Sequence, residues 1–539
     1  MRVPFASRPA VLPRASSLLA SLALALAAAS GHAGVVPPGP ADVQQKGFFG
    51  PVFSWPLMPI HMVLLQDGRV LTYGTNLNGA QGGAMWYSIW DPSVGTGPDA
   101  MLTLDNVWRT DTFCAAQTII PATGEVLVAG GDRVVDGVRN YANNDVNLFN
   151  PVNNMLVKQS QAMAYQRWYA TAVTNQFGEQ VVMGGRMDRT WPSVDPESPA
   201  LLPAFKGGLP VLPSATTVAT YASTPEVYTA GVGWRTLTGA KNEYAYGSIV
   251  PSWNYPRAWL GPKGSVLIFT PGGKIFSLNS KGKGSIQQLT GVLGWGTETL
   301  PGAMYLPGRI LTVRGSGIAK VVDVRGDQPV ITPTANLSVD RRYGNATILA
   351  DGKVWVNGGS STGNDLVGAA YHSETWNPDT GTWTTSATAS QARLYHSASL
   401  LMPDGSVLTG GGGAPGPLTL LNAEIYYPPY LYRTDGSGQP ADRPVVTAAP
   451  TVLAWGQQFN VTLAAGVKAS RVTWMRTGTV THAFNNDQRY TSLGFKQSKT
   501  KLTMTLPTSR AQLPPGYYML FVFDDKGVPS VARTIRLTD

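Results

Sequence analysis

A short phrase that recurs seven times constrains the fold of this 539-residue chain more than any other feature. Each copy has a turn glycine followed by β-branched and aliphatic residues, and several copies end in a pair of glycines. The copies begin at Asp67, Thr123, Phe177, Lys263, Pro307, Asp351 and Asp404. Glycine readily adopts the left-handed backbone of a tight turn, so each copy predicts a β-hairpin. A repeat of about 40 to 50 residues is typical of four-stranded blades. We therefore expect an all-β fold, a seven-bladed, kelch-like β-propeller.

One interval between copies is longer than the others, at 86 residues between the third and the fourth. Residues 188–241 in this interval are rich in Pro, Ser, Thr and Gly, and we expect them to form a loop-like insertion. Two β-sandwiches with coincidental glycine turns are the less favoured alternative, because sandwiches do not repeat one phrase in this way.

The pattern changes after the seventh copy. Residues 422–442 contain a pair of prolines and a Gly/Ser turn cluster, and we expect an irregular linker there. Beyond it, short β segments alternate with turns at residues 458–463, 471–475, 501–506, 517–523 and 532–537. About 100 residues of this texture match the size of an immunoglobulin-like β-sandwich. The predicted domains are a signal peptide at 1–33, the propeller with its linker at 34–442, and the immunoglobulin-like domain at 443–539.

The first 33 residues have the pattern of an export signal. Three arginines precede an Ala/Leu-rich run at residues 16–29, and small residues follow at 31–33. No later stretch reaches the roughly 18 continuous apolar residues of a membrane span. We expect a mature chain without a membrane span that is secreted, either extracellular or periplasmic. An uncleaved N-terminal anchor is the alternative.

The charge balance argues against a nucleic-acid partner. The formal net charge is +9, and it falls to +6 when the three arginines of residues 1–33 are removed. The remaining Lys and Arg residues are scattered, whereas a nucleic-acid groove needs them clustered. Hydrophobic residues make up 43% of the chain and aromatic residues 9%, which excludes a disordered protein. We expect a compact monomer.

Cysteine and histidine are unusually scarce. Cys114 is the single cysteine, so this exported chain can form no internal disulfide. A buried inert thiol is the ordinary interpretation of such a residue. Only four histidines follow residue 33, and we interpret His61 and His372 as structural. Zinc clusters, phosphate-binding loops and dinucleotide fingerprints are absent from the sequence.

Three motifs resemble those of the galactose oxidase and glyoxal oxidase family of copper radical oxidases. They are RLYHS at residues 393–397, THAFNNDQR at 481–489 and PPGYYMLF at 514–521. Together with the propeller and the C-terminal sandwich, the resemblance covers nearly the whole mature chain. It implies one copper ion per chain, held by two histidines and two tyrosines, with one tyrosine joined to a cysteine by a thioether that serves as a radical cofactor.

The resemblance also implies a role for each matching residue. Tyr395 would be the axial tyrosine, which acts as the base. His396 would be the first histidine. His482 would be the second histidine, delivered by a loop of the C-terminal domain. Cys114 would be the thioether cysteine and Tyr169 its partner, and the form RWY at residues 167–169 is similar to the glyoxal oxidase branch.

The chemistry of these residue types agrees with that assignment. Imidazole nitrogens combined with oxygen donors suit copper(II), whereas zinc or calcium would favour thiolates or carboxylates. Two features depart from galactose oxidase. We expect no counterpart of its N-terminal sugar-binding domain, and Arg186 stands where that enzyme has a tryptophan over the cross-linked tyrosine. Trp191 or the insertion could cover the site instead, and Arg257 is a weak candidate for binding substrate.

We expect a secreted oxidase that takes two electrons from a small aldehyde or primary alcohol and reduces dioxygen to hydrogen peroxide. A galactose oxidase-like sugar alcohol oxidase is one alternative. A propeller binding or adhesion module without a redox site is another. A propeller glycoside hydrolase is the least favoured, because no distinctive pair of carboxylates is evident.

Overall fold

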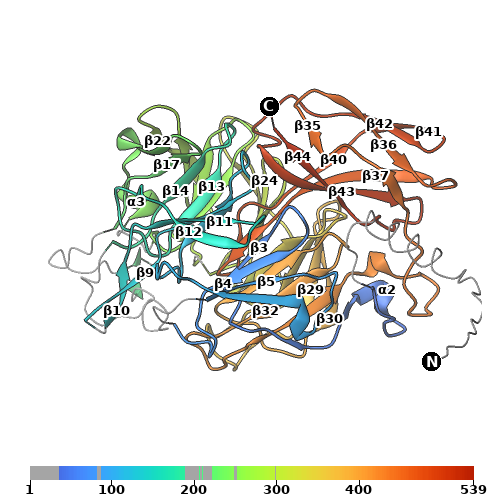
Figure 1. Cartoon of the computed structure of the whole chain (residues 1–539), viewed down its shortest axis with the longest axis horizontal. Helices are drawn as coiled ribbons and strands as arrows, with labels where there is room; N and C mark the ends of the chain where they lie inside the picture. The colour runs from blue at the N-terminus through green and yellow to red at the C-terminus, as the bar shows by residue number, and fades with distance from the viewer. Residues whose placement is uncertain are drawn as a thin grey trace, which may run out of the picture.

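The computed structural model describes residues 35–81, 86–136, 138–187, 205–206, 209–210, 221–247, 252–297 and 299–538. The predicted signal peptide lies outside these residues. Seven antiparallel sheets follow one another along residues 48–427, in agreement with the seven predicted blades, and we call them blades 1 to 7. Figure 1 shows them below and to the left of the C-terminal strands. Helix is scarce among the described residues, where the α-helices are α2 (Val43–Lys46) and α3 (Glu243–Tyr246).

The first four blades run from the inner strand outwards. Blade 1 contains β3 (His61–Leu64), β4 (Val70–Tyr73), β5 (Trp86–Trp90) and β6 (Met101–Asp105). Blade 2 contains β7 (Ala116–Ile119), β8 (Val126–Ala129), β11 (Val146–Asn150) and β12 (Met155–Lys158). Blade 3 contains β13 (Thr171–Thr174), β14 (Gln180–Met183), β17 (Glu226–Thr229) and β18 (Gly233–Thr236). Blade 4 contains β19 (Arg257–Leu260), β20 (Val266–Phe269), β21 (Lys274–Asn279) and β22 (Ser285–Val292).

The remaining blades complete the series. Blade 5 contains β23 (Gly302–Leu306), β24 (Arg309–Val313), β25 (Ala319–Asp323) and β26 (Val330–Pro333). Blade 6 contains β27 (Asn345–Ile348), β28 (Val354–Asn357), β29 (His372–Asn377) and β30 (Thr382–Thr388). Blade 7 contains β31 (Ser397–Leu401), β32 (Val407–Gly411) and β33 (Asn422–Tyr427), and the early strands β1 (Phe48–Phe49) and β2 (Phe53–Ser54) pair with β33. Short hairpins also form between β9 (Asp132–Val135) and β10 (Val138–Ala142), and between β15 (Phe205–Lys206) and β16 (Leu209–Pro210).

Two expectations about irregular segments were wrong in part. The insertion expected at residues 188–241 is shorter, because β17 and β18 belong to blade 3; most of its earlier part lies outside the described residues. The linker expected at residues 422–442 begins later, because residues 422–427 form β33. Its apolar residues Ile425 and Tyr426 pair with Leu408 and Val407 of β32, so the segment completes blade 7.

The glycine pairs of the repeat mark close approaches between neighbouring blades. A Cβ atom at Gly130 would lie 2.2 Å from the carbonyl oxygen of Arg167 in the next blade. At Gly358, it would lie 2.3 Å from the carbonyl oxygen of Arg393. No side chain larger than hydrogen fits at such distances. The glycines therefore allow the connections before the inner strands to pack against the preceding blade.

The C-terminal region is a sandwich of two sheets, as predicted. One sheet has the order β34 (Val446–Ala448), β36 (Gln458–Leu463), β42 (Lys501–Thr505) and β41 (Phe495–Ser498). The other has the order β35 (Val452–Leu453), β44 (Arg533–Leu537), β43 (Gly516–Asp524), β37 (Ala469–Arg476) and β40 (Arg489–Leu493). The two share a core that includes the fully buried Trp474 and Tyr518. All five predicted strand segments are confirmed.

The sandwich inserts a hairpin into the propeller. Between β37 and β40, the chain forms β38 (Thr479–Thr481) and β39 (Phe484–Asn485), and β38 pairs with β3 of blade 1. Blade 1 is thereby a six-stranded sheet to which both domains contribute.

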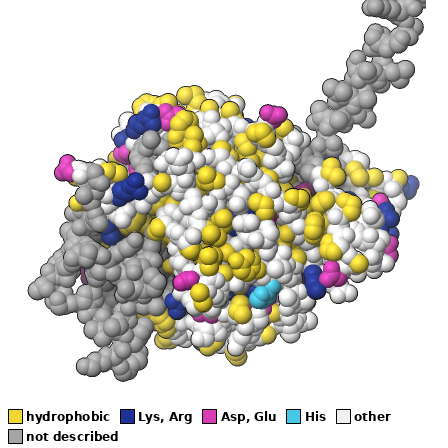
Figure 2. Space-filling view, turned by 90° about the horizontal axis from the view of Figure 1, so that it is seen from below, with side chains coloured by type: hydrophobic (Ala, Val, Ile, Leu, Met, Phe, Trp, Pro, Cys, Tyr) yellow, Lys and Arg dark blue, Asp and Glu magenta, His cyan; other side chains and the backbone are white. Residues whose placement is uncertain are grey.

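The surface agrees with the low charge of the sequence. Viewed from below, the described part of the molecule carries a few separated Lys, Arg, Asp and Glu side chains among many polar and hydrophobic ones (Figure 2). None of the helices among the described residues has the length and apolar character needed to span a membrane.

Candidate metal centre

Three of the candidate residues lie one or two residues before the inner strands of their blades. Cys114 and Tyr169 each precede an inner strand by two residues, β7 and β13 respectively, and His396 directly precedes β31. All three have left-handed backbone, with φ of 57°, 67° and 67°. Such conformations cost about 1–3 kcal/mol in a residue with a side chain and cluster at functional sites. Tyr395 precedes His396, and the bend between them lets both side chains reach one site.

His482 comes from the inserted hairpin. It forms the two-residue turn between β38 and β39 together with Ala483, and their φ values are 49° and 61°. Two successive left-handed residues are the signature of a type I′ turn, which suits the twist of a hairpin. The turn usually contains Asn or Gly, so His and Ala here indicate a position kept in spite of backbone strain. The hairpin places His482 among residues of the propeller.

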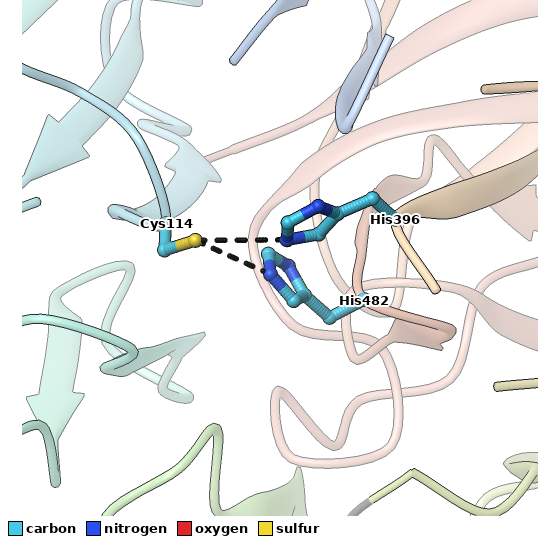
Figure 3. Close-up of side chains that lie close together, drawn as sticks. All are labelled: Cys114, His396 and His482. Carbon is cyan, nitrogen blue, oxygen red and sulfur yellow. Dashed lines mark hydrogen bonds between the residues drawn. The ribbon is translucent and has the colours of Figure 1, made fainter. Parts of the chain in front are cut away.

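Figure 3 shows Cys114, His396 and His482 pointing toward one another. The Sγ of Cys114 lies 3.3 Å from Nε2 of His482 and 3.8 Å from Nε2 of His396. The three potential ligand atoms all lie within 4.8 Å of one another. The hydroxyl groups of Tyr169 and Tyr395 are in direct hydrogen-bond contact. All five predicted site residues are therefore brought together.

Both histidines are held so that Nε2 faces this centre. Nδ1 of His396 lies 2.6 Å from the carbonyl oxygen of Gly413, and Nδ1 of His482 lies 2.6 Å from Oγ1 of Thr481. Because the carbonyl of Gly413 can only accept, Nδ1 of His396 must carry the proton, which leaves a lone pair on Nε2. Metal-binding histidines are commonly oriented in this way.

Burial keeps both imidazoles neutral. It lowers the pKa of His396 to about 3. It also lowers the pKa of His482 well below its ordinary value, with further contributions from His396, His61 and Arg257. Neutral imidazole is the form that binds metal ions. The site is therefore competent to bind a metal without first losing protons from its histidines.

The donor set fits copper. Two neutral imidazole nitrogens and two phenol oxygens converge, and copper(II) favours such nitrogen and oxygen ligands. The rings are packed closely, since the centroids of Tyr395 and His396 lie 3.7 Å apart and those of His396 and His482 lie 4.4 Å apart. The structure also allows a second set of metal ligands, made of the Cys114 thiol and the two imidazoles, because this thiol lies near both Nε2 atoms.

Tyr255 is a neighbour of the site that the sequence analysis missed. Its backbone amide donates a hydrogen bond of 2.7 Å to the carbonyl of Tyr169. Its hydroxyl donates one of 3.2 Å to the carbonyl of Ala115. Its ring centroid lies 4.5 Å from that of His482. Tyr255 thus packs between Tyr169, the candidate for the cross-link, and His482.

A signal for this residue was present in the repeat. Tyr169, Tyr255, Tyr343 and His396 each stand nine positions before the turn glycine of their own copy. All four have left-handed backbone. The ring of Tyr343 packs against Tyr395 with centroids 5.1 Å apart. Aligning the copies on the turn glycine would therefore have found both Tyr255 and Tyr343.

Among the described residues, two tryptophans contact the ring of Tyr169. Trp168, its direct neighbour, meets the Tyr169 ring at a centroid distance of 4.4 Å and an angle of 82°. Arg186 stacks on Trp168 instead of on the tyrosine, at 4.9 Å. Trp191 lies outside the described residues. Trp168 and Tyr169 therefore contact each other edge-on, and Trp253 also meets Tyr169 edge-on.

Three other candidates lie in the interior or at its margin. Arg257 is buried, and its guanidinium packs over the ring of Phe484 at 4.3 Å. His372 pairs with Ser338 Oγ at 3.1 Å, as a structural histidine would. His61 is fully buried and stacks on Tyr73 at 4.4 Å, but its ring nitrogens have no hydrogen-bond partner among the described residues. The ring of His61 is held by packing, while its backbone is paired within β3.

Comparisons with known proteins show which proteins this chain is similar to. Residues 443–537 match the family described as "Galactose oxidase-like, Early set domain". A galactose oxidase of Gibberella zeae is 28% identical, over 91% of this chain and 71% of its own length. Aldehyde oxidase GLOX1 of Arabidopsis thaliana is 23% identical, over 79% of this chain and 72% of its own length.

A solved structure supports the fold. A fungal alcohol oxidase of the AA5 family, in complex with copper, superposes with a TM-score of 0.77 at 24% sequence identity, covering 92% of this chain and 100% of its own. The fold, the sequence relatives and the match of the C-terminal domain agree with one another. Over most of its length, the chain is similar to the galactose oxidase and glyoxal oxidase family of copper radical oxidases.

Proposed function

We propose that this protein is a secreted copper radical oxidase that converts small aldehydes or primary alcohols and reduces dioxygen to hydrogen peroxide. The observation that carries the proposal is the convergence of two neutral histidines, two tyrosines and the single cysteine on one buried centre. Tyr169, Tyr395, His396 and His482 would hold one copper ion. Cys114 would be joined to Tyr169 by a thioether.

The residues of the chain would divide the work as follows. Copper, when bound, would supply a one-electron redox change and would lower the pKa of a bound alcohol or aldehyde hydrate. The cross-linked ring of Tyr169 would supply the second electron change. Tyr395 would accept the substrate proton at its phenol oxygen. Trp168, Trp253 and Tyr255 surround Tyr169 and would keep water from its ring.

One feature of the sequence supports the substrate class. The motif at residues 167–169 is similar to the glyoxal oxidase branch. It favours small aldehydes over galactose. Relatives of both kinds are known, since one is a galactose oxidase and another an aldehyde oxidase.

A peroxide-coupled assay of the copper-loaded protein tests the proposal. Glyoxal-type aldehydes, simple primary alcohols and galactose should be compared at equal concentration. We expect the highest rate with an aldehyde. Strong activity on galactose alone would indicate the galactose oxidase-like alternative, and no activity on any of them after copper loading would favour a binding module.

The closeness of Cys114 to both histidines supports a second candidate. If its thiolate were a direct ligand, the set of two histidines and one cysteine would resemble an electron-transfer copper site. Such a site has an intense thiolate-to-copper absorption band in visible light, and its sulfur carries no bond to Tyr169. The mass of the Cys114 peptide therefore separates this candidate from the oxidase.

A further inference from the structure

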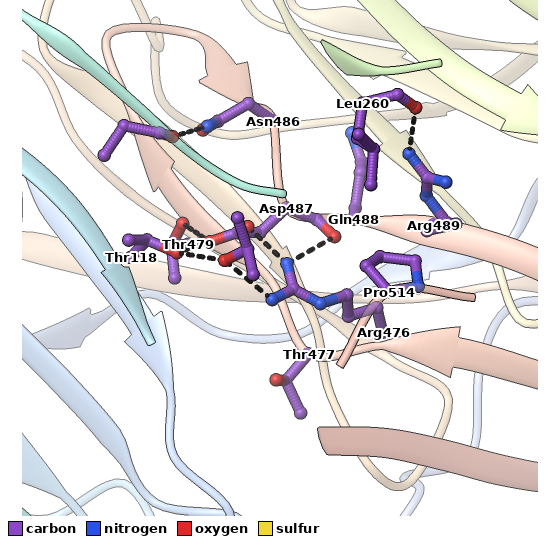
Figure 4. Close-up of polar contacts among 12 residues, drawn as sticks. Thr118, Leu260, Arg476, Thr477, Thr479, Asn486, Asp487, Gln488, Arg489 and Pro514 are labelled. Atoms are coloured by element: carbon purple, nitrogen blue, oxygen red, sulfur yellow. Dashed lines mark hydrogen bonds and ion pairs between the residues drawn. The ribbon is translucent and has the colours of Figure 1, made fainter. Parts of the chain in front are cut away.

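The four residues that follow the His482 hairpin contact four different blades. This segment, residues 486–489, is drawn in Figure 4. Their partners in the propeller, for Asn486, Asp487, Gln488 and Arg489 in order, are Ala172 in β13, Thr118 in β7, Ala346 in β27 and Leu260 in β19. Every partner belongs to an inner strand. The segment therefore fixes the inserted hairpin against blades 2, 3, 4 and 6 together.

The carboxylate of Asp487 contacts three side chains. Its Oδ2 accepts hydrogen bonds from Oγ1 of Thr118 at 2.8 Å and from Oγ1 of Thr479 at 2.7 Å. Its Oδ1 pairs with the guanidinium of Arg476. Both members of this ion pair are buried, with 4% and 5% of their surface exposed. The carboxylate is therefore satisfied by donors alone, which a neutral amide could not match.

Arg476 extends the network to a third strand. Its Nη2 donates to Oγ1 of Thr174 at 3.0 Å and to the carbonyl of Pro515 at 3.3 Å. Thr174 in turn hydrogen-bonds Thr118 at 3.1 Å. The network thus joins β7, β13 and β38 through side chains that are all buried.

These three strands are attached to three of the five residues of the candidate site. β7 follows Cys114, β13 follows Tyr169, and β38 precedes His482. Thr118, Thr174 and Thr479 lie four, five and three residues from those site residues. A short, hydrogen-bonded stretch of strand has little freedom to shift along its axis. Displacing any one threonine would displace the site residue on the same strand.

We propose that Asp487 is a positioning residue that sets His482 relative to Cys114 and Tyr169. This inference rests on the proposed function, because it assumes that His482 binds copper. The physical reason is that a buried carboxylate must keep all its charged and polar partners, so it tolerates only one arrangement of the three strands. The C-terminal sandwich would in this way control the geometry of a centre in the propeller.

The test compares Asp487→Asn with Glu374→Gln. Glu374 is a matched control, since it is 2% exposed and forms a buried ion pair with Arg341 at 2.8 Å in blade 6. Copper(II) titration, the copper(II) EPR spectrum and the mass-spectrometric yield of the Cys114–Tyr169 cross-link are measured on the full chain. We expect D487N to weaken copper binding about 10–100-fold, as loss of an outer partner does in other metal sites. Its spectrum should shift and its cross-link yield should fall, while E374Q leaves all three unchanged.

A milder pair of variants decides the question if D487N does not fold. Thr118→Val removes one donor to Asp487 and keeps the side-chain shape, and Thr118→Ser keeps the hydroxyl. We expect T118V to shift the EPR spectrum and T118S to restore it. If D487N folds and matches wild-type protein in copper binding and EPR spectrum, this inference is wrong and the proposed function is unaffected. If D487N does not fold, the same result with T118V overturns the inference. Wild-type protein that binds no copper would overturn the proposed function, and this inference with it.

Discussion

The backbone amide of Tyr169 donates a hydrogen bond of 3.0 Å to the carbonyl of Cys114. Cys114 leads into β7 and Tyr169 into β13, so this bond joins two adjacent blades at the two residues proposed to become covalently linked. The carbonyl of Tyr169 in turn accepts from the amide of Tyr255 in the next blade. The sulfur and the phenol are therefore held on neighbouring turns before any covalent bond forms.

The first prediction concerns this linkage. Aerobic copper treatment should lower the intact mass by two hydrogen atoms, because a thioether removes one from the sulfur and one from the ring. Digestion should give a branched peptide that contains Cys114 and Tyr169 and survives thiol reductants, since a thioether resists reduction. Cys114→Ser should keep copper and lose most oxidase activity. Complete alkylation of Cys114 in the copper-treated, denatured protein would rule out the radical mechanism.

His482→Ala tests whether the C-terminal domain completes the metal site. Loss of one of four ligands should cost a few kcal/mol of copper binding. Competition with a chelator of known affinity measures this loss. His372→Ala serves as the control, because His372 lies on the outer strand pair of blade 6 and hydrogen-bonds Ser338. Copper retention by H482A equal to that of H372A would remove His482 from the ligand set.

Thr481→Val tests the orientation of His482. The hydroxyl of Thr481 lies 2.6 Å from Nδ1, and valine has the same shape without it. We expect copper affinity to fall about 10–100-fold, because the imidazole loses the partner that fixes its tautomer and angle. Thr481→Ser keeps the hydroxyl and should retain nearly wild-type affinity. If T481V and T481S bind copper equally, the hydroxyl does not orient the ring.

A pH prediction follows from Asp111. Burial, with the neighbouring Asp132, raises the pKa of Asp111 from 3.8 to about 8. Between pH 3.8 and about 8, Asp111 holds a proton in the folded protein that it releases in the unfolded chain. Its contribution to stability is therefore fully present below pH 3.8 and is lost as pH rises through about 8. Asp111→Asn has no proton to lose and keeps the acceptor for the amide of Phe113, bonded at 3.1 Å.

Thermal unfolding of D111N and wild type at pH 5 and pH 8 measures this effect. We expect the melting temperature of D111N to increase relative to that of wild type as pH rises. The difference in their free energies of unfolding should grow by at most about 1.4 kcal/mol per pH unit. Asp99→Asn, at an exposed position, should show no such divergence. Parallel pH profiles of D111N and wild type would show that Asp111 is charged in the folded state.

Much of the fold could be predicted because its signals are local. A turn glycine with flanking β-branched residues determines a hairpin within about ten residues, and seven copies indicate a propeller. The five strand segments predicted after residue 443 were confirmed for the same reason. Segments without a local signal were not predicted correctly: β33 follows a glycine-rich turn and was interpreted as linker, and its partners β1 and β2 are only two residues long.

In the candidate site, too, some features have a local signal in the sequence and others depend on the tertiary structure. Sequence by itself determined which residue types were available, a single cysteine and few histidines, and where each stood relative to the repeat. Only the tertiary structure decided that Cys114 meets His482, because 368 residues separate them and they come from different domains. It also decided the left-handed backbone at Cys114, Tyr169, His396 and His482. Those conformations are unfavourable locally and persist because the packing of the blades around the inserted hairpin offsets their cost.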